Sequence, residues 1–276
     1  MSKSQWQCFV ENLGQWQGSF TRLDADGQEL EDTPSLLNLE GLNQNQTARL
    51  ILQFFTADRQ TLTSEKVFEF STLSRSILFF EQGGFSQGSI QLAPHTEFGA
   101  EFGLIEGNRR LRLVQLFDTQ GQLDRITLIR EQRLGTTAPE RPPLTLEMLL
   151  GQWQGEAITL YPDLRSPDTY TTHLNLDQQG SELTQHLTTS SGLEIISKAE
   201  ISNGVLKFNQ GSQPVQVLLL PDGASCTCPR QIQPRLPLFL EMGWLIQPNL
   251  RQRMIRSYSA SGEWVSLTLV VEHKQS

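Results

Sequence analysis

The pentapeptide Gly-Gln-Trp-Gln-Gly occurs twice in this chain, at residues 14–18 and at residues 151–155. An internal repeat constrains the fold more than any other sequence feature, because it indicates two copies of one structural unit. The repeat extends to residues 108–133 and 249–274, which align at a constant separation of 141 positions. The matching residues in these segments are Arg110 with Arg251, Arg112 with Arg253, Gly121 with Gly262, Thr127 with Thr268 and Glu131 with Glu272. The sequence therefore predicts two similar units in tandem.

The boundary between the units is expected near residue 138. Residues 134–143 are rich in proline and small polar residues, which is typical of a short linker. The predicted domains are therefore residues 1–138 and 139–276. The separation between matching residues is 137 at Gly14 and Gly151, 128 at Gly83 and Gly211, and 141 near the end. This shift places an insertion of the second unit after Gly211, in a segment that we expect to be a loop.

Alternation of apolar and polar residues predicts β-strands in both units. The segments concerned are residues 67–71, 76–80, 111–117, 125–130, 215–220 and 265–271. Helix signal is weak, but residues 4–13 and 145–150 are each predicted to form a short helix before the Trp motif, with Ser4 and Thr145 as N-caps. A long meander of antiparallel strands closes on itself to remove its exposed edges. We therefore predict an all-β protein with two antiparallel barrels, each preceded by a short helix.

Composition excludes several classes of function. A net charge of −8 opposes nucleic-acid binding, which needs clustered basic residues. The sequence contains no run of about 20 apolar residues, so no membrane span is predicted. The start of the chain lacks the apolar core of a signal peptide. Three cysteines do not make a disulfide framework, so a cytoplasmic location is expected. No phosphate-binding loop or nucleophile elbow is found, so a classical enzyme is not expected.

A short helix followed by Gly-x-Trp and a run of antiparallel strands resembles the calycin group of lipocalin-like barrels. In that group the tryptophan closes one end of the barrel, and a basic side chain of the last strand packs on its indole ring. The resemblance implies structural roles for Trp16 and Trp153. It also implies that Arg133 packs on Trp16 and Lys274 on Trp153.

The tandem arrangement is similar to a cyanobacterial and plastid family of two-barrel calycin-like proteins without an established activity. The C-terminal pattern of Arg-x-Arg, Ser-Tyr-Ser, a glycine turn and a strand ending in glutamate is also similar to S/U-type phycobiliprotein lyases. Those lyases hold a bilin and deliver it to a phycobiliprotein. Similarity of fold does not transfer function, but any activity of this chain would follow that of the lyases.

Two arginines of the first unit are candidate ligand-binding residues. Arg110 and Arg112 share one face of a predicted strand, and the opposite face is apolar. In one interpretation the arginines are solvated outside the barrel. In the other they point into the lumen and bind a carboxylate, for which arginine is well suited.

The corresponding strand of the second unit presents a different set of side chains. If the two units pack alike, its inward face carries Met254, Arg256 and Tyr258, which would suit an amphipathic acid. An internal salt bridge or an outward-facing Arg256 is the alternative. The pair Cys226 and Cys228 cannot complete a four-ligand zinc site, so no metal is expected.

We therefore predict a cytoplasmic protein that binds a hydrophobic or amphipathic acidic small molecule, such as a bilin or a fatty acid, in a barrel lumen. No other cofactor is expected. Two alternatives remain. One is a lyase-like chaperone with a phycobiliprotein as its partner, and the other is a structural or interaction protein whose barrels are filled by their own side chains.

Overall fold

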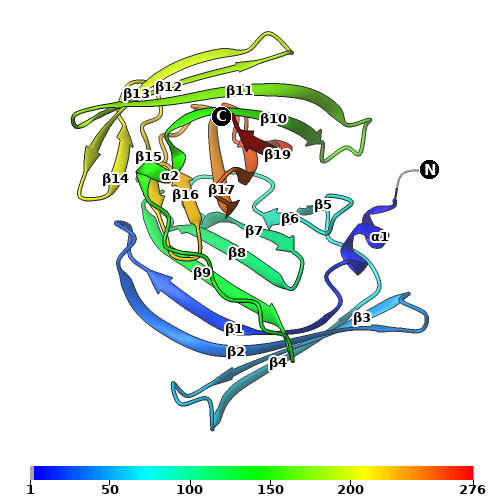
Figure 1. Ribbon diagram of the computed structural model, residues 1–276. Helices are drawn as coiled ribbons and strands as arrows, with labels where there is room; N and C mark the ends of the chain where they lie inside the picture. Colours follow the sequence, from blue (N-terminus) through cyan, green and yellow to red (C-terminus); the bar gives the residue numbers. More distant parts are fainter. Residues whose placement is uncertain (1–2, 276) are drawn as a thin grey trace.

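The computed structural model describes residues 3–275, and these residues form two antiparallel sheets that follow one another along the chain (Figure 1). Helix α1 (Gln5–Val10) precedes the first sheet. The first sheet contains β1 (Gly14–Leu23), β2 (Glu29–Leu42), β3 (Thr47–Phe55), β4 (Leu62–Phe70), β5 (Ile77–Phe79), β6 (Phe85–Gly88), β7 (Phe98–Glu106), β8 (Arg109–Phe117) and β9 (Leu123–Arg133). The predicted all-β fold with a helix before the first Trp motif is confirmed.

The second copy has the same order with one more strand. Helix α2 (Leu146–Leu149) precedes its sheet. The strands are β10 (Gly151–Leu160), β11 (Asp168–Gln179), β12 (Glu182–Thr189), β13 (Glu194–Ser202), β14 (Val205–Phe208), β15 (Val215–Leu219), β16 (Ala224–Cys228), β17 (Leu238–Gln247), β18 (Leu250–Tyr258) and β19 (Trp264–Lys274). Ser4 caps α1 as predicted, with a capping box to Gln7. Thr145 precedes α2 but makes no capping hydrogen bond in the described structure.

The two copies differ in whether their sheet closes into a barrel. Strands β10 to β19 form a closed barrel, as predicted. The first sheet curls in the order β4-β3-β2-β1-β9-β8-β7-β6-β5, and its edge strands β4 and β5 do not pair within residues 3–275. The expected closed barrel is therefore a curled open sheet in the first copy.

The strand register explains this difference. Leu78 on β5 lies opposite Ser86, and Leu218 on β15 lies opposite Cys226, so β5 and β6 correspond to β15 and β16. The additional strand β14 then pairs with both β13 and β15 and closes the second barrel. In the first copy only residues 71–76 connect β4 to β5, which is too short for another strand. The extra residues of the second copy thus lie before β15, whereas the sequence comparison predicted an insertion after Gly211.

Helix α1 covers the open edge of the first sheet. The side-chain amide of Gln5 donates to the carbonyl of Phe79 at 3.0 Å, and the Phe79 amide donates back to Gln5 at 2.7 Å. The Phe9 ring lies 5.5 Å from the ring of Phe70 at the end of β4 and 5.6 Å from that of Phe79 on β5. The helix therefore bridges the two edge strands and satisfies part of the exposed backbone of β5.

Backbone conformation and close strand contacts explain the repeated glycines. Gly14 and Gly151 have φ values of 131° and 104°, which side chains of L-residues rarely allow. A Cβ atom on Gly18 would lie 1.9 Å from the carbonyl oxygen of Arg130 on β9. Gly18 therefore allows the close approach of β1 and β9.

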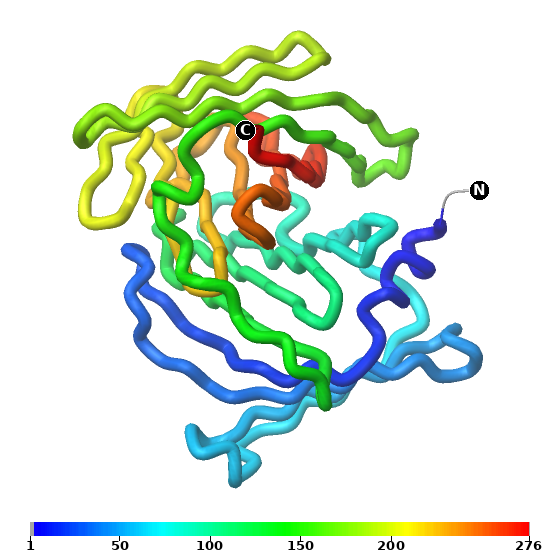
Figure 2. Tube along the Cα trace, viewed as in Figure 1, coloured from blue at the N-terminus to red at the C-terminus, as the bar shows by residue number. Residues whose placement is uncertain are grey.

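The two copies share one hydrophobic core. Phe102 and Leu113 on β7 and β8 pack in the same buried cluster as Met242 and Trp244 on β17. Strands β2–β4 and β11–β13 lie at opposite ends of the molecule, with β7, β8, β16 and β17 between them (Figures 1 and 2). The outer face of β16–β18 is consequently buried against the first sheet rather than exposed to solvent.

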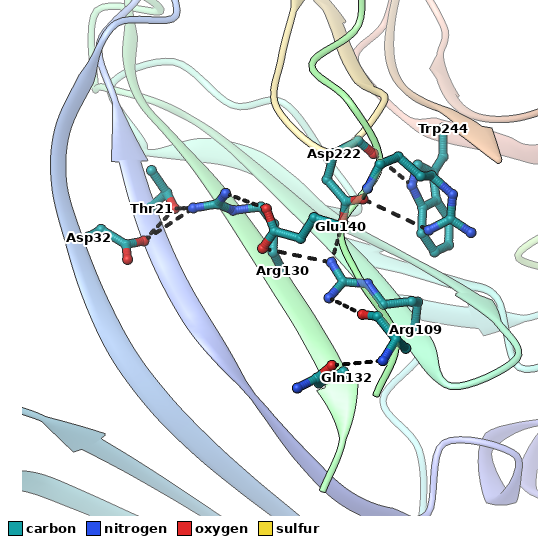
Figure 3. A network of polar contacts seen from close by, with 10 residues as sticks. Thr21, Asp32, Arg109, Arg130, Gln132, Glu140, Asp222 and Trp244 are labelled. Atoms are coloured by element: carbon teal, nitrogen blue, oxygen red, sulfur yellow. Dashed lines mark hydrogen bonds and ion pairs between the residues drawn. The ribbon is translucent and has the colours of Figure 1, made fainter. Parts of the chain in front are cut away.

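A polar network crosses the same boundary (Figure 3). Arg109 on β8 forms an ion pair with Asp222, whose side chain is fully buried in the loop between β15 and β16. The backbone carbonyl of Asp222 accepts a hydrogen bond of 2.9 Å from the Trp244 indole. In the linker, Glu140 pairs with Arg130 at 2.8 Å. Arg141, the next linker residue, pairs with Asp222 of the second copy at 3.8 Å, so paired charges hold the linker to both copies.

Candidate ligand-binding site in the second barrel

Met254, Arg256 and Tyr258 face away from the second lumen. They lie on the outer face of β18, where the first sheet covers them, and at most 2 % of each is exposed. These three residues therefore do not line the lumen, in contrast to the sequence prediction. The physical reason is that the first sheet buries the outer face of β18, so side-chain polarity does not distinguish its two faces.

Arg256 makes its contacts with the first copy. Its Nη2 donates to the backbone carbonyls of Ser76 at 3.2 Å and of Ser89 at 3.1 Å, and its Nε donates to the Tyr258 hydroxyl at 2.7 Å. The guanidinium carbon also lies 3.5 Å from the ring centroid of Trp264. Burial lowers the pKa of Arg256 and raises the pKa of Tyr258. These residues connect the two copies.

The second barrel contains a cavity of about 480 Å³ that is partly open to solvent. Most of its apolar lining comes from α2 and the segment from β11 to β15, including Leu146, Leu149, Leu174, Leu176, Leu183, Leu187, Leu206, Phe208, Val215 and Val217. The charged lining residues all come from β17 and β18, and they are Glu241, Arg251 and Arg253. The cavity therefore has an apolar wall and a wall with polar and charged groups, which suits an amphipathic molecule.

The charged wall is an internal network. Arg253 donates to Glu272 at 3.1 and 3.3 Å and to Glu241 at 3.2 Å. Arg251 donates through Nε to Glu272, and its guanidinium carbon lies 5.0 Å from the Trp153 ring centroid. Burial opposes ionisation of Glu272, but the charges of the two arginines outweigh it and lower the pKa of that carboxyl group. The network is thus ionised and mutually compensated.

The first copy contains the same network. Arg110 donates to Glu131 at 2.7 and 3.0 Å, and Arg112 pairs with Glu131 at 3.0 Å and with Glu101 at 2.7 Å. Burial opposes ionisation of Glu131, yet the two arginine charges hold its pKa at about 2. Arg110 and Arg112 therefore point to the inner face and are not solvated outside, in contrast to one sequence interpretation. A ligand contact by either arginine stays a prediction.

The two tryptophans are buried at one end of each sheet, next to the cations that the resemblance implied. The guanidinium carbon of Arg133 lies 4.4 Å from the Trp16 ring centroid, and the Lys274 ammonium lies 5.3 Å from that of Trp153. Both indole groups donate to the backbone of the preceding segment, at 2.9 Å for Trp16 and 2.8 Å for Trp153. Each indole is therefore held by a hydrogen bond as well as by a cation.

Two buried polar atoms of residues that line the cavity lack hydrogen-bond partners among the described residues, and both atoms are shielded from the cavity itself. They are Nη2 of Arg251 and Oγ1 of Thr172, in residues that are 5 % and 3 % exposed. Sequence reasoning placed Arg251 on the strand face opposite to the expected lumen. Its alignment with Arg110, which was a candidate, is the signal that identifies it. Thr172 carries no such signal.

Cys226 and Cys228 lie on β16 rather than in a loop. Both side chains are fully buried, and their sulfur atoms are 3.9 Å apart. The hydrogen bond with the neighbouring Cys228 thiol, together with burial, raises the pKa of Cys226. Within residues 3–275, no group of three or more His, Cys, Asp or Glu side chains is arranged to hold a metal ion.

The fold and the cavity define a tandem all-β protein in which a curled open sheet is followed by a closed barrel that contains a cavity. The chain belongs to the DUF3598 family. A crystal structure of a family member of unknown function from Nostoc punctiforme PCC 73102 is 50% identical, with a TM-score of 0.93. The match covers 99% of this chain and 100% of that chain.

The two halves of the chain match different protein families. Residues 2–136 match the family described as domain of unknown function (DUF3598), N-terminal. Residues 140–275 match the family described as biogenesis factor required for ATP synthase 1, C-terminal domain. A comparison with curated proteins finds no match.

Other structural similarity is weak. The S-type phycobiliprotein lyase CPES from Guillardia theta is 10% identical with a TM-score of 0.35, covering 47% of this chain and 90% of that chain. Kievitone hydratase from Nectria haematococca is 9% identical with a TM-score of 0.23, covering 100% of this chain and 93% of that chain. Neither value carries a functional argument. In the described part of the chain, no helix has the length and apolar character needed to cross a membrane.

Proposed function

We propose that the second barrel binds a hydrophobic or amphipathic small molecule in its lumen. The observation that carries the proposal is a cavity in the barrel lumen whose lining is largely apolar, with Glu241, Arg251 and Arg253 on one wall.

The size of the cavity supports the same proposal. A volume of about 480 Å³ falls in the range of about 300–1,000 Å³ that is usual for small-molecule pockets. Contact with the leucine-rich wall would remove ligand hydrocarbon from water, at about 25 cal/mol per Å² of apolar surface. The polar wall would then orient the ligand.

The test is a titration with Nile red, an uncharged probe whose fluorescence rises in apolar surroundings. Ser257→Trp places an indole in the second lumen, and Leu116→Trp is the matched control at the equivalent position of the first copy. We expect saturable binding that Ser257→Trp weakens at least tenfold and Leu116→Trp preserves. Circular dichroism verifies folding. No saturable binding, or equal loss in both variants, contradicts the proposal.

A second candidate function is protein handling during assembly of a complex. It is favoured by the match of residues 140–275 to a biogenesis factor required for ATP synthase. Leu193 and Ile195 line the cavity and are exposed, and the neighbouring Ile196 is 66 % exposed. Titration calorimetry with purified ATP synthase subunits tests it. Ile196→Asp should abolish the heat of binding, and Leu30→Asp in the first copy is the control.

Bilin delivery is the narrower form of the first proposal, with a bilin as ligand and a phycobiliprotein as acceptor. It is supported by the C-terminal pattern alone, and its test is a saturable, red-shifted absorbance band when a bilin is added. A cytoplasmic location is also proposed. The three free cysteines, Cys8, Cys226 and Cys228, support a reducing compartment.

A further inference from the structure

Four sulfur-bearing side chains lie together on the outer face of the second barrel. Cys226 on β16 is opposite Met242 on β17, and Met242 is opposite Met254 on β18. Cys228 follows Cys226 by two residues, so its side chain is on the same face of β16. All four side chains are fully buried in the core that the two copies share. The chain has three cysteines and four methionines, and two of each form this thiol–thioether cluster.

The two thiols of the cluster converge. Alternate residues of a strand are about 6.6 Å apart along its axis, yet the sulfur atoms of Cys226 and Cys228 are only 3.9 Å apart. A metal–sulfur bond of about 2.3 Å lets one ion contact two sulfur atoms that are up to about 4.6 Å apart. One metal ion can therefore contact both thiols without a rearrangement of β16.

The fold by itself does not require sulfur at these positions. In the first copy Ser86 is opposite Phe102, and Phe102 is opposite Leu113, in the same register as Cys226, Met242 and Met254. The position of Cys228 corresponds to Gly88. None of these four residues of the first copy carries sulfur, so the cluster is a departure of the second copy from the repeat.

We propose that the thiol–thioether cluster binds one Cu(I) ion, with the two cysteines as its main ligands and the two methionines as weaker thioether ligands. Thiolate and thioether groups are soft ligands, and together they select Cu(I) among the biological metal ions. The sequence excluded a four-ligand zinc site, and thioethers are not among the usual ligands of zinc. A site for a soft monovalent ion is compatible with that exclusion.

This site is separate from the proposed ligand cavity and goes beyond it. Side chains alternate along β16 and β17, so Thr227 and Glu241 line the cavity while the neighbouring Cys226 and Met242 face the first copy. Binding of Cu(I) therefore does not depend on an occupied lumen.

A monovalent ion suits the charge of this apolar core. The hydrogen bond to the Cys228 thiol and burial raise the pKa of Cys226, so both thiols hold their protons in the metal-free protein. Cu(I) binding forms a copper–sulfur bond and releases one thiol proton to solvent, with no change of oxidation state. One positive charge replaces another, and the remaining sulfur atoms are neutral donors. The buried site thus gains no net charge, which limits the cost of desolvation.

Burial makes the expected site a closed one. Structural metal sites are enclosed by their ligands, and such binding is coupled to folding. Because both sheets cover the cluster, the ion should enter as the chain folds and should then be protected from chelators.

The experiment is refolding of the full chain from urea with Cu(I) under anaerobic conditions, followed by a challenge with bathocuproine disulfonate, a chelator that colours on binding Cu(I). We expect one Cu(I) per chain to resist the chelator in the folded protein and to be released when urea unfolds it. Retention should also raise the thermal midpoint, since the ion binds the folded state. No retained copper, or immediate release from the folded protein, overturns the proposal. Neither result bears on Nile red binding, which tests the cavity.

Variants assign the retained copper to the cluster. Cys228→Ala should abolish retention, and Met242→Leu, which nearly conserves side-chain volume, should speed release at least tenfold. Cys8→Ala in α1 and Met148→Leu in α2 are the matched controls outside the cluster and should retain copper as the wild type does. Met242→Leu keeps the test valid if Cys228→Ala does not fold, which circular dichroism verifies. Equal effects of the cluster variants and their controls contradict the assignment.

Discussion

Arg256 of the second copy donates a hydrogen bond of 3.1 Å to the backbone carbonyl of Ser89 in the first copy. The same guanidinium donates to Ser76, also in the first copy, and no carboxylate is paired with it in the described structure. A buried cation is thus stabilised by carbonyl dipoles, the Tyr258 hydroxyl and the Trp264 ring. Its position makes Arg256 a connection between the copies.

Arg256→Ala is expected to destabilise the whole chain and to leave ligand affinity unchanged. The variant removes a fully buried side chain that donates to Ser76 and Ser89 and packs on the Trp264 ring, which costs on the order of 3 kcal/mol in free energy of unfolding. Urea denaturation measures the loss, and Nile red titration of the folded protein measures affinity. A variant with wild-type stability that no longer binds the probe would show that Arg256 acts at the ligand instead.

Asp222 provides a second connection whose removal is testable. Its buried carboxylate pairs with Arg109, so Asp222→Asn leaves the buried Arg109 with the more distant carboxylate of Glu140 at 3.9 Å and should cost about 3 kcal/mol of stability. Asp26 pairs with Arg230 across the same boundary, but both side chains are more than half exposed. Asp26→Asn should therefore cost less than about 1 kcal/mol. Denaturant midpoints of the two variants give the comparison, and similar losses would contradict the role of burial.

The sequence predicts the repeat, the strands and the Trp motif well because these depend on local pattern and spacing. Alternation along β18 also separates Arg251 and Arg253 from Met254 and Arg256 correctly. It does not say which of the two faces is the lumen, because packing of the first sheet buries the outer face as well. That packing is a long-range relationship between the copies.

The sequence also did not predict that only the second sheet closes into a barrel. Residues 205–208 form β14. In the sequence comparison they align with β5, because Leu206 and Phe208 match Leu78 and Phe80. Strand pairing aligns β5 with β15 instead. Pairing partners depend on the curvature of the whole sheet, which a single sequence does not contain.

The pKa of Glu131 predicts loss of stability in acid. The Arg110 and Arg112 charges lower the pKa of this carboxyl group from 4.5 to about 2 in the folded protein. Because the folded pKa is below the unfolded one, the contribution is complete above about pH 5 and disappears as pH falls toward 2. The shift corresponds to on the order of 3 kcal/mol.

Urea denaturation at several pH values between 2 and 6 measures this dependence. Glu131→Gln should be less stable than the wild type at pH 6 and should show a flatter decline toward pH 2, because its side chain does not titrate. Glu65→Gln, at an exposed position on β4, is the control and should retain the wild-type slope. An unchanged slope in Glu131→Gln would assign the acid sensitivity to other carboxyl groups.

The shared core predicts that the two predicted domains do not fold separately. In a fragment of residues 139–276, the outer face with Met242, Trp244 and Met254 would lose the first sheet that buries it. Exposed apolar patches of this kind favour aggregation. The intact chain should unfold in one cooperative transition, whereas fragments 1–138 and 139–276 should each be aggregated or poorly dispersed in NMR spectra. Mixing them during refolding should restore Nile red binding, and a monodisperse, well-dispersed fragment 139–276 would show that the second barrel is an independent domain.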